Sequence, residues 1–175
     1  MTEKTIVREV KIAGQPFVLR SSDVVHALRA ANADLIKPAN GERALIAASG
    51  IGDLEVVQFL LNAKVDANAT DTLGRVTTTT ALMSASEKGH LDVVRALLDA
   101  KADVNATGIL GTALMVAAQR GHLDVVKALL DANADVNVRK VNPVDSRISV
   151  TALTIAKGSG HNDIAELLHQ RGGHD

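Results

Sequence analysis

Residues 89–106 read GHLDVVRALLDAKADVNA, and residues 121–138 repeat them almost letter for letter as GHLDVVKALLDANADVNV. The two copies begin 32 residues apart. A fixed period of this size is typical of a solenoid, in which each unit is too small to bury its own apolar face and stacks on its neighbours. The repeat therefore predicts a solenoid fold and argues against a catalytic site.

Weaker copies extend the period in both directions. The upstream copy, GDLEVVQFLLNAKVDANA at residues 52–69, begins 37 residues before Gly89. The downstream copy, GHNDIAELL at residues 160–168, begins 39 residues after Gly121. Residues 23–34, DVVHALRAANAD, match the unit without its preceding turn. The chain thus holds four fairly complete units and one fragment.

Each unit is predicted to form two short helices, an inner and an outer one. Residues 81–88 are rich in small side chains, and the following Gly89 suits a left-handed helix terminus, where a side chain would be penalised. In the next helix the apolar residues 93, 94, 97 and 98 form one stripe, and Asp92 lies in the first turn, where it favours the helix dipole. The motif ADVN at residues 102–105 has the small and Asx residues of a turn.

The stretch TALMSASEKGHLDVVRALLDAKADVNA at residues 80–106 resembles the ankyrin repeat, whose family pattern is roughly T-P-L-H-x-A-A-x-x-G-H-x-x-V-V-x-L-L-L-x-x-G-A-D-V-N-A. The resemblance covers Asp23 to about Gly172. It implies an all-α repeat solenoid, a helix-turn-helix stack with β-turn fingers between the repeats.

Two positions of the chain depart from the family pattern. The family Pro is replaced by Ala44, Ala81, Ala113 and Ala152, and the family His of the same motif is replaced by Ile46, Met83, Met115 and Thr154. In the family, that His forms hydrogen bonds that tie neighbouring loops. We therefore expect the loops of this chain to lack those ties.

We expect one continuous domain, with an N-terminal cap at residues 1–40 and repeats at about 41–73, 74–106, 107–138 and 139–175. Residues 5–10 and 17–19 are rich in β-branched or aromatic residues and are separated by AGQP, which predicts a β-hairpin. Ser21 or Ser22 would then cap a helix over residues 23–30. The hairpin is expected to cover the first repeat, because an open solenoid needs capped ends. A former junction with another domain is the alternative.

The C-terminal end is predicted to carry its own cap. His169 stands where the second repeat has Leu98, and Ala165 stands where it has Val94, so the last helix is more polar than the others. The glycine pair at residues 172–173 is expected to end that helix.

Composition narrows the function classes further. The net charge is −1 and the aromatic residues are Phe17 and Phe59 only, so neither a basic stripe nor a stacking platform for nucleic acid is expected. The absence of cysteine excludes a disulfide framework, a thiolate metal site and a cysteine nucleophile. No stretch approaches the roughly 20 apolar residues of a membrane helix, and the first residues lack the apolar region of a signal peptide. We expect a cytoplasmic monomer without cofactors that binds neither nucleic acid nor membrane.

The connections between repeats, called fingers, break the period. The distance from the turn Asn to the residue that starts the next helix is about 8 in the family. In this chain the distance is 12 residues from Asn68 to Thr80, 7 from Asn105 to Thr112 and 14 from Asn137 to Thr151. Loops tolerate insertions, so drift would also explain the first long finger (residues 69–79) and the second long finger (residues 138–150). We favour contact with a partner, because apolar residues flanked by Arg are typical of interfaces.

The candidate partner-binding residues lie in the fingers and at the solvent ends of the inner helices. They are Leu73, Arg75, Val76 and Thr78 in the first long finger, Ile109 and Leu110 in the short finger, Arg139, Lys140, Val144, Arg147 and Ile148 in the second long finger, and Glu87, Lys88, Gln119 and Arg120 at the helix ends. The four residues at the helix ends would also fit an ordinary solvent-exposed helix face without a binding role. The equivalent Met83 and Met115 could line an adaptable contact patch, although filling gaps in the core is the commoner role of methionine.

Histidines at 90, 122 and 161 occupy one equivalent position in successive repeats. Neighbouring helices pack about 10 Å apart, too far for these side chains to share a metal ion at bond lengths of about 2 Å. A structural role in the repeat is therefore expected. The chain contains no G-x-S-x-G or H-E-x-x-H motif, and we expect no catalytic residue and no metal site.

The leading hypothesis is a non-catalytic scaffold that holds another protein against its concave inner helices and fingers. The resemblance leaves two alternatives open. The chain could be an inhibitor or immunity protein that occludes the active site of a partner enzyme with its second long finger. It could also be a regulatory module of a larger protein.

Overall fold

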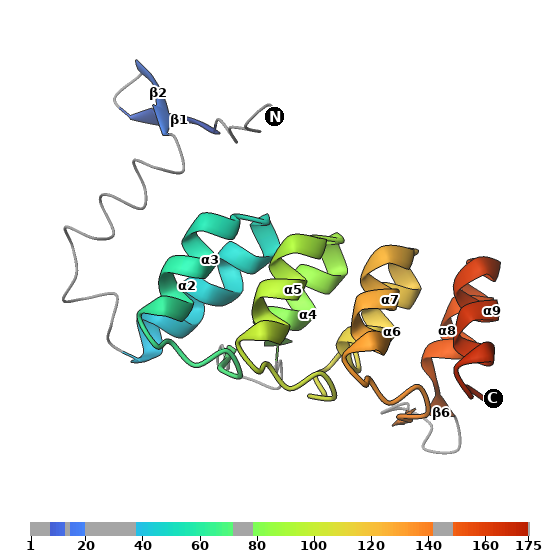
Figure 1. Cartoon of the computed structure of the whole chain (residues 1–175). Helices are drawn as coiled ribbons and strands as arrows, with labels where there is room; N and C mark the ends of the chain where they lie inside the picture. The colour runs from blue at the N-terminus through green and yellow to red at the C-terminus, as the bar shows by residue number, and fades with distance from the viewer. Residues whose placement is uncertain (1–7, 13–14, 20–37, 72–78, 142–148, 175) are drawn as a thin grey trace.

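The computed structural model describes residues 8–12, 15–19, 38–71, 79–141 and 149–174. In this part of the chain, four helix pairs stand side by side in a row, with the inner helices in one layer and the outer helices in a second layer (Figure 1). The inner helices are α2 (Pro38–Ile51), α4 (Ala81–Lys88), α6 (Ala113–Arg120) and α8 (Ala152–Gly158). The outer helices are α3 (Leu54–Asn62), α5 (Leu91–Asp99), α7 (Leu123–Asp131) and α9 (Asn162–Gln170). The predicted repeat solenoid is confirmed.

Threonine begins three of these inner helices. The Thr80 hydroxyl accepts a hydrogen bond from the Met83 N–H at 3.2 Å, and the Thr112 hydroxyl accepts one from the Met115 N–H at 3.3 Å. Thr151 caps α8 in the same way. Each cap satisfies an N–H group that the first turn of a helix leaves unpaired. Because the cap recurs at the same repeat position, each finger enters the next helix at a fixed point.

The core lies between the two layers and consists mainly of Leu, Val and Ala, with a few Ile and Met side chains. One equivalent leucine in each inner helix is buried: Leu45, Leu82, Leu114 and Leu153. The outer helices contribute a matching row of buried leucines: Leu60, Leu97, Leu129 and Leu168. Alanine at many of the remaining contact positions lets such short helices approach closely, and the core continues from repeat to repeat.

A glycine with left-handed backbone links each inner helix to its outer helix, with φ of +74° at Gly89 and +78° at Gly121. In the first three repeats the structure adds a second requirement for glycine, because the histidine of the next repeat lies over it. A Cβ on Gly89 would lie 2.7 Å from Nδ1 of His122, and a Cβ on Gly121 would lie 2.5 Å from Cε1 of His161. A side chain here would strain the backbone and displace the ring as well.

The histidine rings are held by backbone carbonyls of the preceding repeat. His122 Nε2 lies 3.1 Å from the Glu87 carbonyl oxygen, and His161 Nε2 lies 3.3 Å from that of Gln119. The imidazole of His90 covers Gly52 in the same way as His122 covers Gly89. These contacts confirm the structural role predicted for the repeated histidine.

The turns after the outer helices are tied together by asparagine. The Asn68 carboxamide oxygen accepts a hydrogen bond from the Asp103 N–H at 2.6 Å, and that of Asn105 accepts one from the Asp135 N–H at 2.8 Å. Asn137 bonds to the C-terminal turn at Gly172 and His174. Although the family His is absent, hydrogen bonds from asparagine side chains still connect neighbouring turns. The sequence pattern did not indicate these bonds.

At the N-terminal end, β1 (Arg8–Ile12) pairs antiparallel with β2 (Gln15–Leu19), which confirms the predicted hairpin. Ser21, Ser22 and the helix predicted over residues 23–30 lie outside the described residues. The capping role of the hairpin therefore stays a prediction. Helix α2 has 14 residues against 8 in α4 and begins at Pro38, a residue suited to the first position of a helix.

At the C-terminal end, α9 ends at Gln170, and His169 is exposed as its place in a terminal cap requires. The glycine pair ends the helix as predicted. Gly172 has a φ of +87°, and the Gly173 N–H donates to the Leu168 carbonyl oxygen at 2.9 Å. A Cβ on Gly173 would lie 2.8 Å from that oxygen, so only glycine fits this close turn.

Candidate functional site

Both long fingers leave the stack as antiparallel two-stranded ribbons. In the first, β3 (Thr70–Asp71) pairs with β4 (Thr79–Thr80), and in the second, β5 (Lys140–Val141) pairs with β6 (Ser149–Val150). The ribbons and the short finger lie along the same edge of the stack, at the N-terminal ends of the inner helices (Figure 1). The tips of the long fingers, residues 72–78 and 142–148, lie outside the described residues.

The short finger is a tight turn closed at Gly108 and Gly111. The Gly108 N–H donates to the Gly111 carbonyl oxygen at 2.9 Å, and the Gly111 N–H donates back at 3.0 Å. This geometry leaves Ile109 and Leu110 at the tip, with 46% and 47% of their surfaces exposed. Among the described residues, the only other large hydrophobic side chain with comparable exposure is Ile51 at 39%. Two adjacent aliphatic side chains at a turn, where polar residues are usual, are an unusual surface feature.

The short finger lies against the base of the second long finger. Gly111 is buried with a φ of +97°, and a Cβ on it would lie 3.4 Å from Cδ of Lys140. The stem of Lys140 therefore passes beside the short finger. Arg139, which is exposed, donates from Nη1 to the Ser149 hydroxyl at 3.2 Å across the ribbon. Aliphatic and cationic side chains thus meet on two neighbouring fingers.

A small charge cluster occupies the C-terminal ends of two inner helices. Arg120 Nη2 on α6 lies 2.6 Å from Oε1 of Glu87 on α4, and Lys88 Nζ lies 3.7 Å from the same oxygen. The side chains of Lys88 and Arg120 are 57% and 53% exposed, whereas that of Glu87 is 25% exposed. The helix-end candidates, including the exposed Gln119, do face solvent, but Glu87 is largely engaged by the two cations.

Met83 and Met115 belong to the core. Met83 is 5% exposed and Met115 is 1% exposed, which confirms the commoner role of methionine and excludes the alternative that they line a contact patch. Each follows the capping threonine into the first turn of its helix, which turns the side chain into the stack. The sulfur of Met115 packs against Gly111, where a Cβ would lie 2.4 Å from it. Filling a gap in the core is the role that the structure gives them.

Seven candidate residues fall on the tips of the long fingers and lie outside the described residues: Leu73, Arg75, Val76, Thr78, Val144, Arg147 and Ile148. Their contact with a partner stays a prediction. We give the name finger face to the side of the stack that carries the fingers and the inner helices. Its described candidates are Ile109, Leu110, Arg139 and Lys140 at the fingers, and Lys88 and Arg120 at the opposite ends of α4 and α6.

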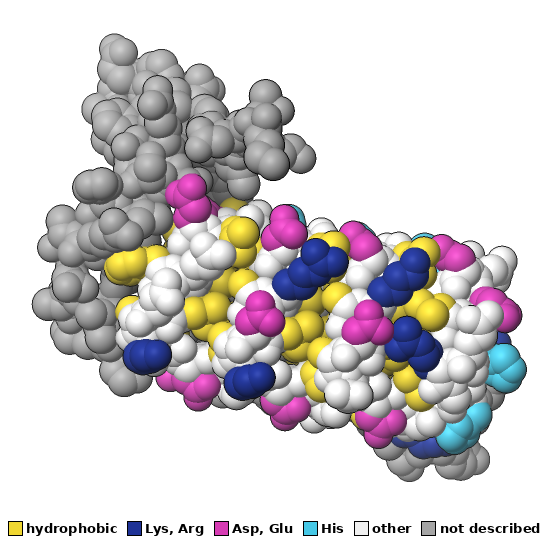
Figure 2. Space-filling model, in the orientation of Figure 1, with side chains coloured by type: hydrophobic (Ala, Val, Ile, Leu, Met, Phe, Trp, Pro, Cys, Tyr) yellow, Lys and Arg dark blue, Asp and Glu magenta, His cyan; other side chains and the backbone are white. Residues whose placement is uncertain are grey.

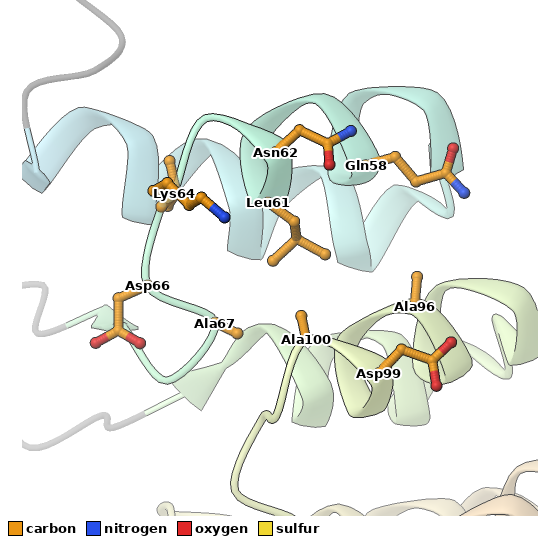
Figure 3. A pocket seen from close by; sticks show the side chains of 10 residues that line it. Gln58, Leu61, Asn62, Lys64, Asp66, Ala67, Ala96, Asp99 and Ala100 are labelled. Carbon is orange, nitrogen blue, oxygen red and sulfur yellow. The ribbon is translucent and has the colours of Figure 1, made fainter.

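The sequence did not point to the grooves between outer helices. A groove of about 620 Å³ lies between α3 and α5, where Leu61 faces Ala67 and Ala100 (Figure 3). A second groove of about 480 Å³ lies between α5 and α7. Figure 2 shows them as apolar strips between successive helices. The alanines that recur on the outer helices were the available signal, since a small residue at each crossing leaves a furrow.

The chemistry of these grooves favours no ligand. The groove between α5 and α7 is lined by Arg95 and Lys127 together with Asp99, Asp124 and Asp131, so charges of both signs alternate along it. Within the described residues there is also no group of three or more His, Asp or Glu side chains that could hold a metal ion. The finger face, which carries an exposed aliphatic pair and basic side chains, is the stronger candidate site.

Comparison with known families agrees with the architecture. A family model for ankyrin repeats in sets of 3 copies matches residues 18–108, 74–140 and 107–175. A search of curated proteins gives no match. Among the described residues, no helix is both long and apolar enough to cross a membrane.

Proposed function

The chain belongs to the ankyrin repeat family, and we propose that it binds a partner protein through its finger face. Ankyrin repeats are in general protein–protein interaction modules, and the family is typically non-catalytic. The partner would contact the tips of the fingers and the adjoining ends of the inner helices. The repeat fold itself does not name that partner.

The exposed aliphatic pair of the short finger carries this proposal. Ile109 and Leu110 are about half exposed although the turn that holds them needs no apolar residue. Burying the exposed part of one such side chain contributes about 1 kcal/mol to association. Lys140, whose stem passes beside Gly111, adds a positive charge next to the short finger. An exposed aliphatic pair with a cation nearby is a suitable protein-binding surface.

The test is to capture partners with the tagged wild-type chain and with an Ile109→Ser, Leu110→Ser variant, from cells that express the protein. An Ile51→Ser variant is the matched control, because Ile51 is also an exposed aliphatic residue but lies at the end of α2. We expect quantitative mass spectrometry to show partners lost from the double variant and retained by the control. Equal recovery by all three proteins would contradict the proposal.

Insertion of the second long finger into an enzyme's active site is a more specific version of this function. The paired strands β5 and β6 at its base support it, because they hold both ends of the finger next to α8. Shortening residues 138–150 to the family length would then abolish inhibition of a captured hydrolase without abolishing the fold. Inhibition by the shortened chain equal to that of the wild type would exclude this version. A role as the regulatory module of a larger protein predicts instead a gene that continues beyond the present ends.

A further inference from the structure

The small net charge of the chain hides a separation of charge between its two faces. The outer helices and their turns, residues 52–68, 89–105, 121–137 and 159–174, carry 11 acidic and 5 basic residues. Figure 2 shows this face, where acidic and basic side chains are interspersed. The excess has structural causes. Asp92 and Asp124 lie in first turns of helices, where they favour the helix dipole, and the aspartates of the turns accept backbone hydrogen bonds.

The opposite balance holds on the inner helices, the short finger and the described part of the second long finger. These segments carry six basic residues, Arg43, Lys88, Arg120, Arg139, Lys140 and Lys157, and two acidic residues, Glu42 and Glu87. Glu87 is already shared between Arg120 and Lys88. The cluster at the centre of this side is therefore cationic even where it contains a carboxylate.

The cations of the inner helices form a row. Lys88, Arg120 and Lys157 each lie in the last turn of their helix, on α4, α6 and α8. Lys88 Nζ and Arg120 Nη2 lie 3.7 Å and 2.6 Å from the same Glu87 oxygen, so the charged groups of these two side chains lie close together. A single acidic stretch of a partner could therefore reach both.

The aliphatic pair and the cationic row lie at opposite ends of the inner helices. Helix α6 has 8 residues and therefore spans about 12 Å between the short finger and Arg120. Lys140 and Arg139 add positive charge on the finger side. One segment crossing the finger face would thus meet Ile109 and Leu110 on one side and cations on the other.

We propose, building on the proposed function, that the finger face recognises an acidic, extended segment of a partner protein that also carries a large aliphatic side chain. The segment crosses α6: its carboxylates pair with Lys88 and Arg120 at one end of the helix, and an aliphatic side chain about four residues away packs on Ile109 and Leu110 at the other. Electrostatic complementarity of this kind selects the partner and raises the association rate. The acidic outer face repels the same segment and so directs it to the finger face.

An acidic protein segment fits this surface better than nucleic acid does. Single-stranded nucleic acid is held by aromatic side chains that stack on bases. The aromatic residues of the chain are Phe17 and Phe59, which lie in β2 and in the outer helix α3. The apolar part of the finger face is aliphatic. It offers packing to a side chain and no stacking platform to a base.

The experiment uses the full chain against a displayed library of random 12-residue peptides, and the best retained peptide is then measured by fluorescence anisotropy. A first variant, Lys88→Gln, Arg120→Gln, Lys140→Gln, removes three charges from the finger face. A second variant, Arg95→Gln, Lys101→Asn, Lys127→Gln, removes three charges from the outer face and is the matched control. We expect retained peptides to be net negative, and the dissociation constant to rise about tenfold or more in the first variant and less than about twofold in the second.

The possible outcomes separate this proposal from the proposed function. Retention of neutral or basic peptides that depends on Ile109 and Leu110 would overturn the acidic partner and leave the proposed function standing. Retention that only the outer-face variant abolishes would overturn both. A lack of any preference for acidic peptides over basic ones overturns the charge proposal, as does tighter binding of a labelled single-stranded DNA oligonucleotide than of the best peptide.

Discussion

The second and third repeats are nearly identical in sequence, whereas the fingers between repeats differ from one another. In the outer helices of these repeats, residues 89–106 and 121–138 share nearly every letter, and equivalent side chains such as Val94 and Val126 are equally buried. The three fingers differ from one another in length and sequence, and the short one exposes two aliphatic residues. The repeated part fixes the shape and stability of the stack, and the fingers vary without disturbing it. Each prediction below changes one side of this comparison.

The largest effect is expected from one substitution made in both regions. Leu97→Ala removes a leucine with no exposed surface from the repeated core and should lower the free energy of unfolding by about 2–5 kcal/mol. Leu110→Ala makes the same chemical change at a half-exposed finger tip and should cost less than about 0.5 kcal/mol. Urea denaturation followed by circular dichroism measures both. Similar losses from the two variants would mean that the short finger belongs to the core.

A second pair of variants separates backbone strain from packing at the glycine turn. Gly89→Ala places a Cβ 2.7 Å from the His122 ring at a positive φ, and the ring must then leave the Glu87 carbonyl. We expect a loss of about 2–3 kcal/mol. Gly160→Ala has a similar φ of +79° but no heavy atom within 4 Å, so only the backbone cost of about 1 kcal/mol should appear. Thermal denaturation measures both variants. Equal losses of stability would show that Gly89 is not needed to leave room for the His122 ring.

A smaller effect is expected where two repeated turns are joined. Asn105→Ala removes the acceptor of the 2.8 Å hydrogen bond from the Asp135 N–H, and both residues are exposed. Water replaces part of the bond, so the loss should be about 0.5–1 kcal/mol. The control is Asn62→Ala, an exposed asparagine at the end of α3. Hydrogen exchange of the Asp135 amide should speed up in the Asn105 variant only. Unchanged exchange would show that the hydrogen bond from Asp135 to Asn105 does not protect this amide.

The smallest effect is expected to be a gain. The hydroxyls of Ser49 and Ser86 are buried without a hydrogen-bond partner, at equivalent positions of the first two repeats. The third repeat has the buried Ala118 at this position, so alanine fits. Ser86→Ala should raise the free energy of unfolding by about 0.5–1 kcal/mol, because it removes a desolvated polar group. A lower melting temperature would show that the hydroxyl has a partner in solution.

The contrast between repeats and fingers also explains how far the sequence could be interpreted. The helices, the glycine turns, the terminal hairpin and the fingers follow from local residue types, and all of them were predicted. The finger residues Ile109 and Leu110 were chosen as contact candidates because they are apolar residues at a turn, and the structure shows both exposed. The fate of Met83 and Met115 was not settled by the sequence, because an apolar residue on an inner helix can face either the core or the concave surface.

The sequence by itself determined the period, the helix pair within each unit and the positions where the period breaks. The tertiary structure alone decided the contacts between units. His122 lies over Gly89, Asn105 bonds to the turn at Asp135, and Arg120 pairs with Glu87, each across roughly one repeat of sequence. Such contacts depend on the rotation and rise from one repeat to the next, which no local pattern encodes. The same stacking places the cations of the inner helices in one row and the acids of the outer helices on the opposite face, and so gives a nearly neutral chain two faces of opposite charge.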